Sequence, residues 1–140
     1  MEKKLIEIMQ LYFKAGKELN LEMMYKLYAN DFENIRIDKA GQIIRIYKAQ
    51  FMQRFQSMKA KGLTHGPGDD IEIIGTSFYD NLGSVLVRRN ENEQSALYNF
   101  VWRIKEGNPI ELIREFTVEE DLSKLIAMTK CSGDEERSLG

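Results

Sequence analysis

The sequence is poor in the residues that build disulfides and most metal centres. Cys131 is the only cysteine and His65 the only histidine among 140 residues. No internal disulfide can form, and neither a Cys–Cys nor a Cys–His zinc pattern can be assembled. We therefore predict no metal and no cofactor. The single cysteine suits a reducing compartment.

Long apolar runs and a large excess of one charge are also absent. No run approaches the roughly 20 apolar residues that span a bilayer. Glu7, Gln10 and Lys14 interrupt the stretch MEKKLIEIMQLYF before a signal-peptide core forms. The 20 basic and 22 acidic residues give a formal net charge of −2, which disfavours nucleic acid and anionic membranes as partners. We expect a cytoplasmic protein.

Length and composition are those of one globular domain. The hydrophobic share is 43% and the charged share 30%, and 140 residues can bury a substantial core. The last residues, SGDEERSLG, are polar. We expect a single domain over residues 1–130 and a flexible C-terminal tail over residues 131–140.

The first half of the chain has helical periodicity. Apolar or small residues recur at helical spacing at Leu5, Met9, Tyr12, Phe13 and Gly16. This pattern predicts a helix to about Glu18, and Asn20 can cap a second helix that ends near Asn30. Residues 35–46 predict a short hairpin, and a third helix follows that ends at Gly62.

The second half has the alternation of strands. After the loop THGPGDD come the runs IEIIGTSFY, GSVLVRRN, ALYNFVWRI and IELIREFTV, with short connections that predict a four-stranded antiparallel meander. An amphipathic piece from Asp121 predicts a short last helix. The order predicts an α+β fold in which a curved antiparallel sheet wraps around three N-terminal helices, a cone-shaped α+β barrel with space inside.

Two stretches and the element order carry a resemblance to a known family. The stretches are IMQLYFKAGKELNLEMMYKLYANDF and NFVWRIKEGNPIELIREFT. Over roughly residues 3–120 the chain resembles the nuclear transport factor 2-like superfamily, which includes ketosteroid isomerases, SnoaL-type polyketide cyclases, scytalone dehydratase and proteins described as lumazine-binding. The resemblance implies the cone-shaped fold with an internal cavity, of a SnoaL-like or lumazine-binding type.

The resemblance also implies where an isomerase would keep its catalytic groups. The tyrosine that holds the oxyanion falls on Tyr12, but the catalytic aspartate falls near Arg36 and the second acid on Phe100. Asp38 shares the strand face of Arg36 if no bulge intervenes. An isomerase needs a placed base as well as a donor. We therefore predict no ketosteroid isomerase activity.

One face of the strand ALYNFVWRI carries the rings of Tyr98, Phe100 and Trp102. The matching face of the next strand, IELIREFTV, carries the carboxylate of Glu115. If these faces line a cavity, burial raises the pKa of Glu115 unless Arg36, Tyr12 or a water supports it. A register shifted by one residue would instead turn Glu115 to solvent and Arg114 or Phe116 inward. The rings can equally be ordinary core. The candidate ligand-binding residues are Tyr12, Arg36, Phe55, Tyr98, Phe100, Trp102, Ile113, Glu115 and Thr117, and of these Glu115 and Tyr12 are the candidate catalytic residues.

Other groups of residues have two interpretations each. Met23, Met24, Met52 and Met58 make either an adaptable cavity wall or ordinary core. A basic strip across neighbouring strands is one interpretation of Arg88, Arg89 and Arg103. The other is a solvated sheet edge on which these arginines pair with Glu91 and Glu93. His65 in its Gly/Pro loop is interpreted as a solvated residue.

The outer face of the meander is too apolar to meet only water. It carries Leu97, Val101, Leu112 and Phe116, so we expect a covering element or a homodimer through the sheet. Three functions remain open. The first is binding of a small planar or apolar ligand in the cavity. The second is a metal-free cyclase, dehydratase or isomerase that uses Glu115 and Tyr12. The third is a protein-interaction module that docks through the sheet face.

Overall fold

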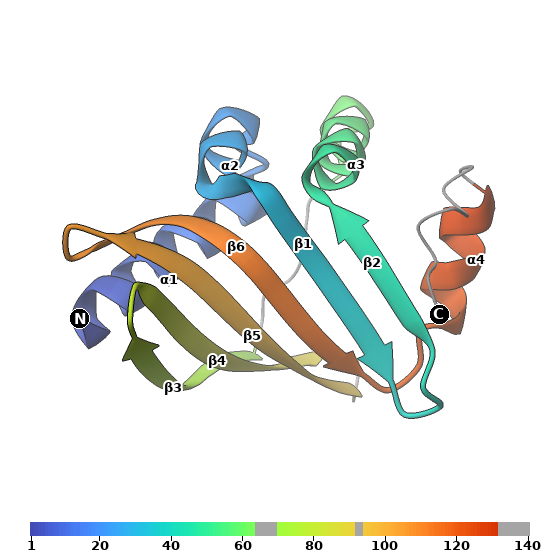
Figure 1. The fold of residues 1–140 in the computed structure, drawn as a ribbon. Helices are drawn as coiled ribbons and strands as arrows, with labels where there is room; N and C mark the ends of the chain where they lie inside the picture. The colour runs from blue at the N-terminus through green and yellow to red at the C-terminus, as the bar shows by residue number, and fades with distance from the viewer. Residues whose placement is uncertain (64–69, 92–93, 132–140) are drawn as a thin grey trace.

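The computed structural model describes residues 1–63, 70–91 and 94–131 (Figure 1). His65 with most of its loop, and the predicted tail beyond residue 131, lie outside the described residues. The elements in chain order are α1 (Glu2–Glu18), α2 (Leu21–Leu27), β1 (Tyr28–Asp38), β2 (Ile43–Tyr47), α3 (Lys48–Ala60), β3 (Asp70–Tyr79), β4 (Leu82–Glu91), β5 (Gln94–Lys105), β6 (Asn108–Glu119) and α4 (Ser123–Cys131).

The six strands form one curved sheet in the order β2-β1-β6-β5-β4-β3. The predicted hairpin is β1–β2, and the predicted antiparallel meander is β3 to β6. One pairing was not predicted: β1 and β6 run parallel and join the hairpin to the meander. The predicted α+β fold is confirmed, and the sheet remains open between its two edge strands, β2 and β3.

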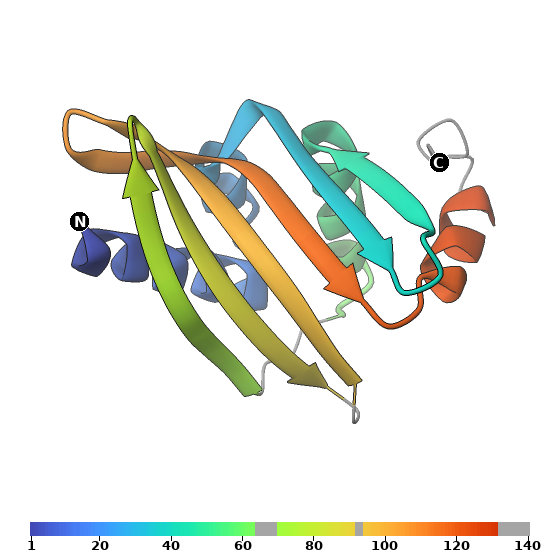
Figure 2. The same ribbon diagram turned by 60° about the horizontal axis from the view of Figure 1, so that its bottom comes forward.

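The three N-terminal helices lie on one side of the sheet (Figure 2). Leu19 ends α1 in a left-handed conformation with φ of 50°, and the Asn20 side chain then accepts a hydrogen bond from the Met23 N–H, as predicted for a helix cap. The second helix ends at Leu27, earlier than the predicted Asn30, because the chain is already in β1 at Tyr28 and pairs there with Leu112.

The core lies between α1 and the middle of the sheet. Trp102 is fully buried, and its indole N–H points at the sulfur of Met9 at 3.2 Å. Gly83 on β4 faces the same helix so closely that a Cβ there would lie 2.6 Å from Leu5 Cδ2. The strand therefore approaches α1 where it has no side chain.

A β-bulge changes which residues of β6 face inward. Phe100 opposes Glu115 and Val101 opposes Arg114, but Trp102 opposes Leu112. Ile113 is the extra residue of the bulge. Beyond it the alternation is inverted, so the prediction that Leu112 lies on the outer face is wrong: Leu112 is fully buried in the core beside Trp102.

Asp38 links the start of α4 to the β1–β2 turn through hydrogen bonds. Its carboxylate accepts hydrogen bonds from the main-chain N–H groups of Leu122 (2.8 Å), Gln42 (2.9 Å) and Ala40 (3.0 Å). These bonds, the one from Leu122 first, lower the pKa of Asp38. Asp38 thus has a structural role. Within the described ranges, none of the helices combines the length and apolar character needed to cross a bilayer.

Candidate functional site

A cavity of about 740 Å³ lies between the N-terminal helices and the concave face of the sheet. This volume suits a small organic ligand. Six of the nine predicted ligand-binding residues line it, and these are Tyr12, Arg36, Phe55, Tyr98, Phe100 and Glu115. Of the four methionines proposed as a cavity wall, Met24 lines the cavity, while Met52 is buried in the core.

Three predicted residues do not line this cavity. Trp102 is sealed in the core against Met9. Ile113 is the unpaired residue of the bulge and is half-buried, and it is not among the residues that line the cavity. Thr117 is buried beside Asn34, whose amide N–H₂ lies 3.5 Å from its hydroxyl. The aromatic stripe is therefore divided, with one ring in the core and two at the cavity.

Aromatic rings form the wall on the strand side. Tyr98 and Phe100 are stacked with ring centroids 5.7 Å apart and planes 4° apart. Tyr12 and Phe13 of α1 meet Phe100 edge-on at 5.6 and 5.8 Å. Phe100 is only 3% exposed, whereas Tyr98 is half-buried and presents its hydroxyl to Arg89. A planar ligand would find a flat apolar surface here.

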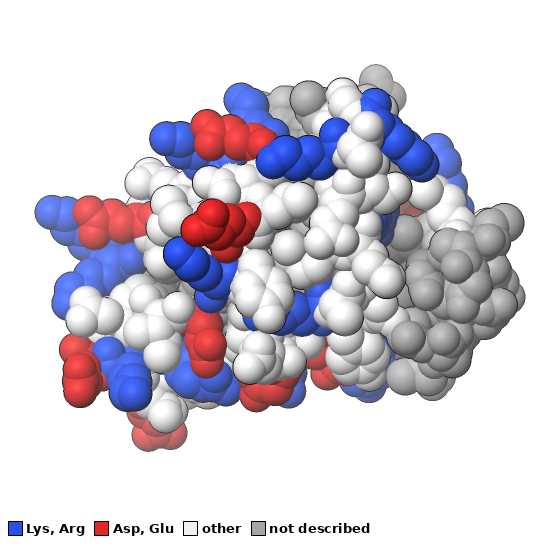
Figure 3. Space-filling view, turned by 90° about the horizontal axis from the view of Figure 1, so that it is seen from above, with Lys and Arg blue, Asp and Glu red and all other residues white. Residues whose placement is uncertain are grey.

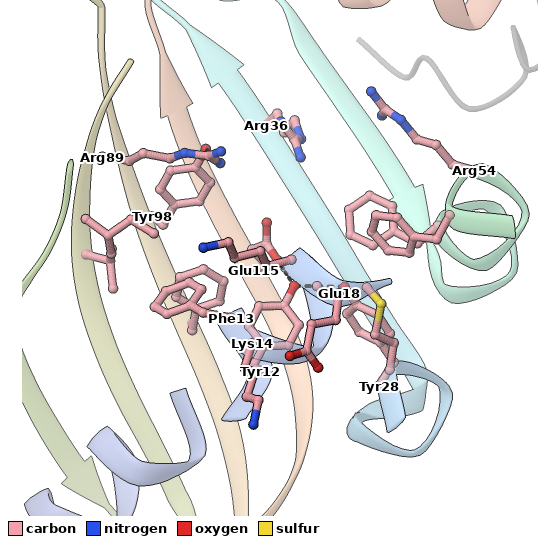
Figure 4. Close-up of a pocket in the computed structure, with 18 of the residues that line it drawn as sticks. Tyr12, Phe13, Lys14, Glu18, Tyr28, Arg36, Arg54, Arg89, Tyr98 and Glu115 are labelled. Atoms are coloured by element: carbon pink, nitrogen blue, oxygen red, sulfur yellow. Dashed lines mark hydrogen bonds between the residues drawn. The ribbon is translucent and has the colours of Figure 1, made fainter. Parts of the chain in front are cut away.

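Glu115 lies at the centre of the cavity and is buried (Figure 4). The Tyr12 hydroxyl donates to its Oε1 at 3.0 Å, and the Asn34 amide donates to its Oε2 at 3.1 Å. The Tyr12 hydroxyl also lies 2.8 Å from the Tyr28 hydroxyl. The inward register is therefore the correct one of the two considered, and Phe116 points outward with 41% of its surface exposed.

Burial is the main cause of the raised pKa of Glu115. The nearby Arg36 cation and the Tyr12 hydrogen bond oppose this shift without cancelling it. Burial and the Glu115 charge together raise the pKa of Tyr12 well above its usual range, so its hydroxyl remains a donor. The pair is thus a carboxyl group that binds a proton more readily than a solvated one, next to a phenol that keeps its own.

Arg36 extends this network along the cavity. Its Nε donates to Asn34 Oδ1 at 2.7 Å, and its Nη1 forms an ion pair with Glu119 Oε2 at 3.3 Å. Burial lowers the pKa of Arg36, but the charges of Glu115 and Glu119 outweigh burial and raise it overall. The guanidinium is held in place by neighbours on two strands.

Two further arginines line the same end of the cavity. Arg89 donates to the Tyr98 hydroxyl at 3.3 Å, and Arg54 comes from α3. In Figure 4 the side chains of Arg36, Arg54 and Arg89 lie toward one end of the cavity, and Lys14 and Glu18 lie toward the other. The interpretation of Arg88, Arg89 and Arg103 as one group is wrong, because Arg88 pairs with Glu72 on the outside and Arg103 pairs with Asp31 and Glu111. Glu91 and Glu93 lie outside the residues whose side chains are described.

The fold has clear counterparts among solved structures. A protein from Shewanella baltica described as NTF2-like and of unknown function superimposes with a TM-score of 0.64 at 10% identity, over 85% of this chain and 93% of the other. The chain has the nuclear transport factor 2-like fold. An NTF2-like protein of unknown function from Silicibacter pomeroyi gives a TM-score of 0.65 at 8% identity, over 84% and 94% of the two chains. A de novo designed protein with the NTF2 fold gives 0.56 at 11% identity, over 92% and 94%.

No protein-family model and no curated protein matches the sequence. The NTF2-like fold therefore rests on shape, and the site must be interpreted from its own residues. Across the part of the chain that the structure describes, no group of three or more His, Cys, Asp or Glu side chains is placed to hold a metal ion.

Sequence reasoning missed several residues of this cavity. Arg89 shares a strand face with Val85 and Val87, so simple alternation along β4 would have found it. Arg54 follows Phe51 by three residues and precedes Phe55 by one, a position beside the buried stripe of α3. Asn34 and Glu119 had no local signal, because their positions depend on the parallel pairing of β1 with β6.

Proposed function

We propose that this protein binds a small planar ligand in the cavity. The observation that carries the proposal is a hollow of about 740 Å³ with stacked rings on one wall and a hydrogen-bonded carboxyl group at its centre. Small-molecule sites combine an apolar lining with a few placed polar groups in this way. A protein-interaction module would have no use for such a cavity. We also propose that the protein is of the SnoaL-like or lumazine-binding type and that it is cytoplasmic.

Native mass spectrometry tests this proposal directly. Protein purified from the expressing cells should carry an extra small-molecule mass that denaturation releases. A variant that fills the cavity, Val87→Phe, should lose that mass, because Val87 is buried and lines the cavity. The neighbouring Leu86 is exposed on the outer side of the same strand, so Leu86→Phe is the matched control. A wild-type protein that carries no ligand and that no planar aromatic compound protects from thermal unfolding would overturn the proposal.

A second candidate is a metal-free cyclase, dehydratase or isomerase, and the pairing of Glu115 with Tyr12 favours it. A carboxyl group with a raised pKa can exchange a proton with a bound substrate, and a phenol can donate to a developing oxyanion. Glu115→Gln separates the two functions. It should abolish turnover if the protein is such an enzyme, whereas a binding protein should only bind its ligand more weakly.

We also propose a homodimer through the convex face of the sheet. Apolar side chains are exposed there on neighbouring strands, and they are Leu86, Leu97, Phe116 and Val118. A soluble monomer rarely leaves so many adjacent apolar side chains open to water. Seen from above, the molecule has charged side chains of both signs around a region of uncharged residues (Figure 3).

A further inference from the structure

Three guanidinium groups line one cavity, and they come from three different elements. Arg36 lies on β1, Arg54 on α3 and Arg89 on β4 (Figure 4). They lie toward the same end of the cavity, where Arg89 donates to the hydroxyl of Tyr98, the ring that stacks on Phe100. A purely apolar ligand would not need this concentration of positive charge.

Two of these cations also act on each other. Glu115 and Glu119 line the same part of the cavity, and Glu119 forms an ion pair with Arg36. The Arg36 charge lowers the pKa of Arg54, in addition to the effect of burial, so the two cations are close enough to repel each other. An oxyanion bound between Arg36 and Arg54 would relieve this repulsion.

Donor groups also remain available for a ligand. Arg36 uses its Nε for Asn34 and its Nη1 for Glu119, and its Nη2 has no hydrogen-bond partner among the residues the structure describes. Arg54 makes neither a hydrogen bond nor an ion pair within those same residues. A guanidinium presents its N–H groups in a fork that fits two oxygens of one anion.

We propose that the cavity selects planar ligands that carry an oxyanion, and that Arg36, Arg54 and Arg89 bind this oxyanion while the planar body lies on Tyr98 and Phe100. The proposal rests on the proposed binding function and names its ligand class. Carboxylates and phosphate esters share this chemistry. They differ in charge, because a phosphate ester carries nearly two negative charges and a carboxylate carries one.

The test compares acids with their neutral amides by isothermal titration calorimetry. The probes are 2-naphthoate, indole-3-acetate and quinoline-2-carboxylate, each paired with its amide, and 2-naphthyl phosphate is included to distinguish the two oxyanions. A hydrogen bond to a charged group contributes about 1.5 kcal/mol or more, so at least one acid should bind about tenfold more tightly than its amide. Weaker binding of 2-naphthyl phosphate than of 2-naphthoate would assign the site to carboxylates, and tighter binding would assign it to phosphate esters.

Single substitutions assign the preference to the arginines. Arg54→Gln and Arg89→Gln should each reduce the preference for acid over amide, and the amide affinity should be unchanged. Arg88→Gln is the matched control, because Arg88 adjoins Arg89 in sequence but pairs with Glu72 on the outside of the sheet. It should leave both affinities as they are in the wild-type protein.

The possible outcomes distinguish failure of the oxyanion proposal from failure of the proposed binding of planar ligands. If the amides bind and the acids gain nothing, the cavity binds planar molecules and the oxyanion proposal is wrong. If the acids are preferred but the preference survives in the Arg54→Gln/Arg89→Gln double variant, the assignment to these arginines is wrong. If no acid, amide or phosphate binds, both the oxyanion proposal and the proposed function fail.

Discussion

Glu115→Gln should change how the stability of the protein depends on pH. The folded pKa of Glu115 is raised above its usual value of 4.5, mainly by burial. Folding is therefore helped by the bound proton below the unfolded pKa, and this help is lost as the pH rises through the folded pKa. The titratable or charged groups that act on Glu115 are Tyr12 on α1, Tyr28 and Arg36 on β1, Arg89 on β4 and Glu119 on β6.

Glutamine can take the place of the protonated acid without losing its partners. Its oxygen can accept from the Asn34 amide, and its nitrogen can donate to the Tyr12 oxygen while Tyr12 donates to Tyr28. Below pH 4 the two proteins should therefore differ by about 1 kcal/mol or less. As the pH rises between the two pKa values, the wild type should lose up to about 1.4 kcal/mol per pH unit relative to the variant.

Urea unfolding from pH 4 to pH 8 measures this difference. Trp102 is the only tryptophan and is fully buried, so its fluorescence reports the unfolding of the core. Glu22→Gln is the control for the same substitution at an exposed position, since the Glu22 side chain is 83% exposed. A difference between wild type and Glu115→Gln that stays constant or grows in favour of the wild type as pH rises would refute the reasoning.

Three other predictions concern packing, acid stability and assembly. Gly83→Ala should cost about 1–3 kcal/mol of unfolding free energy, because its Cβ would lie 2.6 Å from Leu5 Cδ2. Gly75→Ala, whose Cβ meets nothing within 4 Å, should not show this loss, and equal losses in both would contradict the steric cause. Because the folded pKa of Asp38 is lowered, its stabilisation is present above the unfolded value of 3.8 and is lost as pH falls through the folded value. The wild type should therefore unfold at a higher temperature than Asp38→Asn, and this difference should become smaller as the pH is lowered. A difference that becomes larger at acid pH would contradict the stabilising role of the Asp38 carboxylate. In light scattering the wild type should have twice the chain mass of 16.3 kDa and Phe116→Arg the chain mass itself, whereas a wild-type monomer at micromolar concentration would exclude the dimer.

The sequence was informative wherever the signal was local. Strand alternation places Tyr98 and Phe100 on one face, and one of the two registers considered for the neighbouring strand turns Glu115 to the same side. Helix spacing is enough to place Tyr12 inward. Asn20 is recognisable as a cap because its side chain acts within the next turn. These features depend on residues a few positions apart.

The features that sequence reasoning missed depend on pairing between distant segments. Because of the bulge at Ile113, Leu112 pairs with Trp102 and both side chains are buried in the core. The sequence of β6 contains no signal that predicts the extra residue. Asn34 bonds Glu115 across 81 positions because β1 lies parallel to β6. Arg89 is a different case: its alternation was available, but the adjacent Arg88 made the pair look like one exposed charge group.

The bulge also divides the concave face into two parts that can change independently. On one side of Ile113, the inward positions of β6 are Glu115 and Thr117, which are polar. On the other side Leu112 meets Trp102, and this part is hydrocarbon packed against α1. Substitutions around Glu115 can therefore alter what the hollow accepts while the sealed half continues to hold the fold.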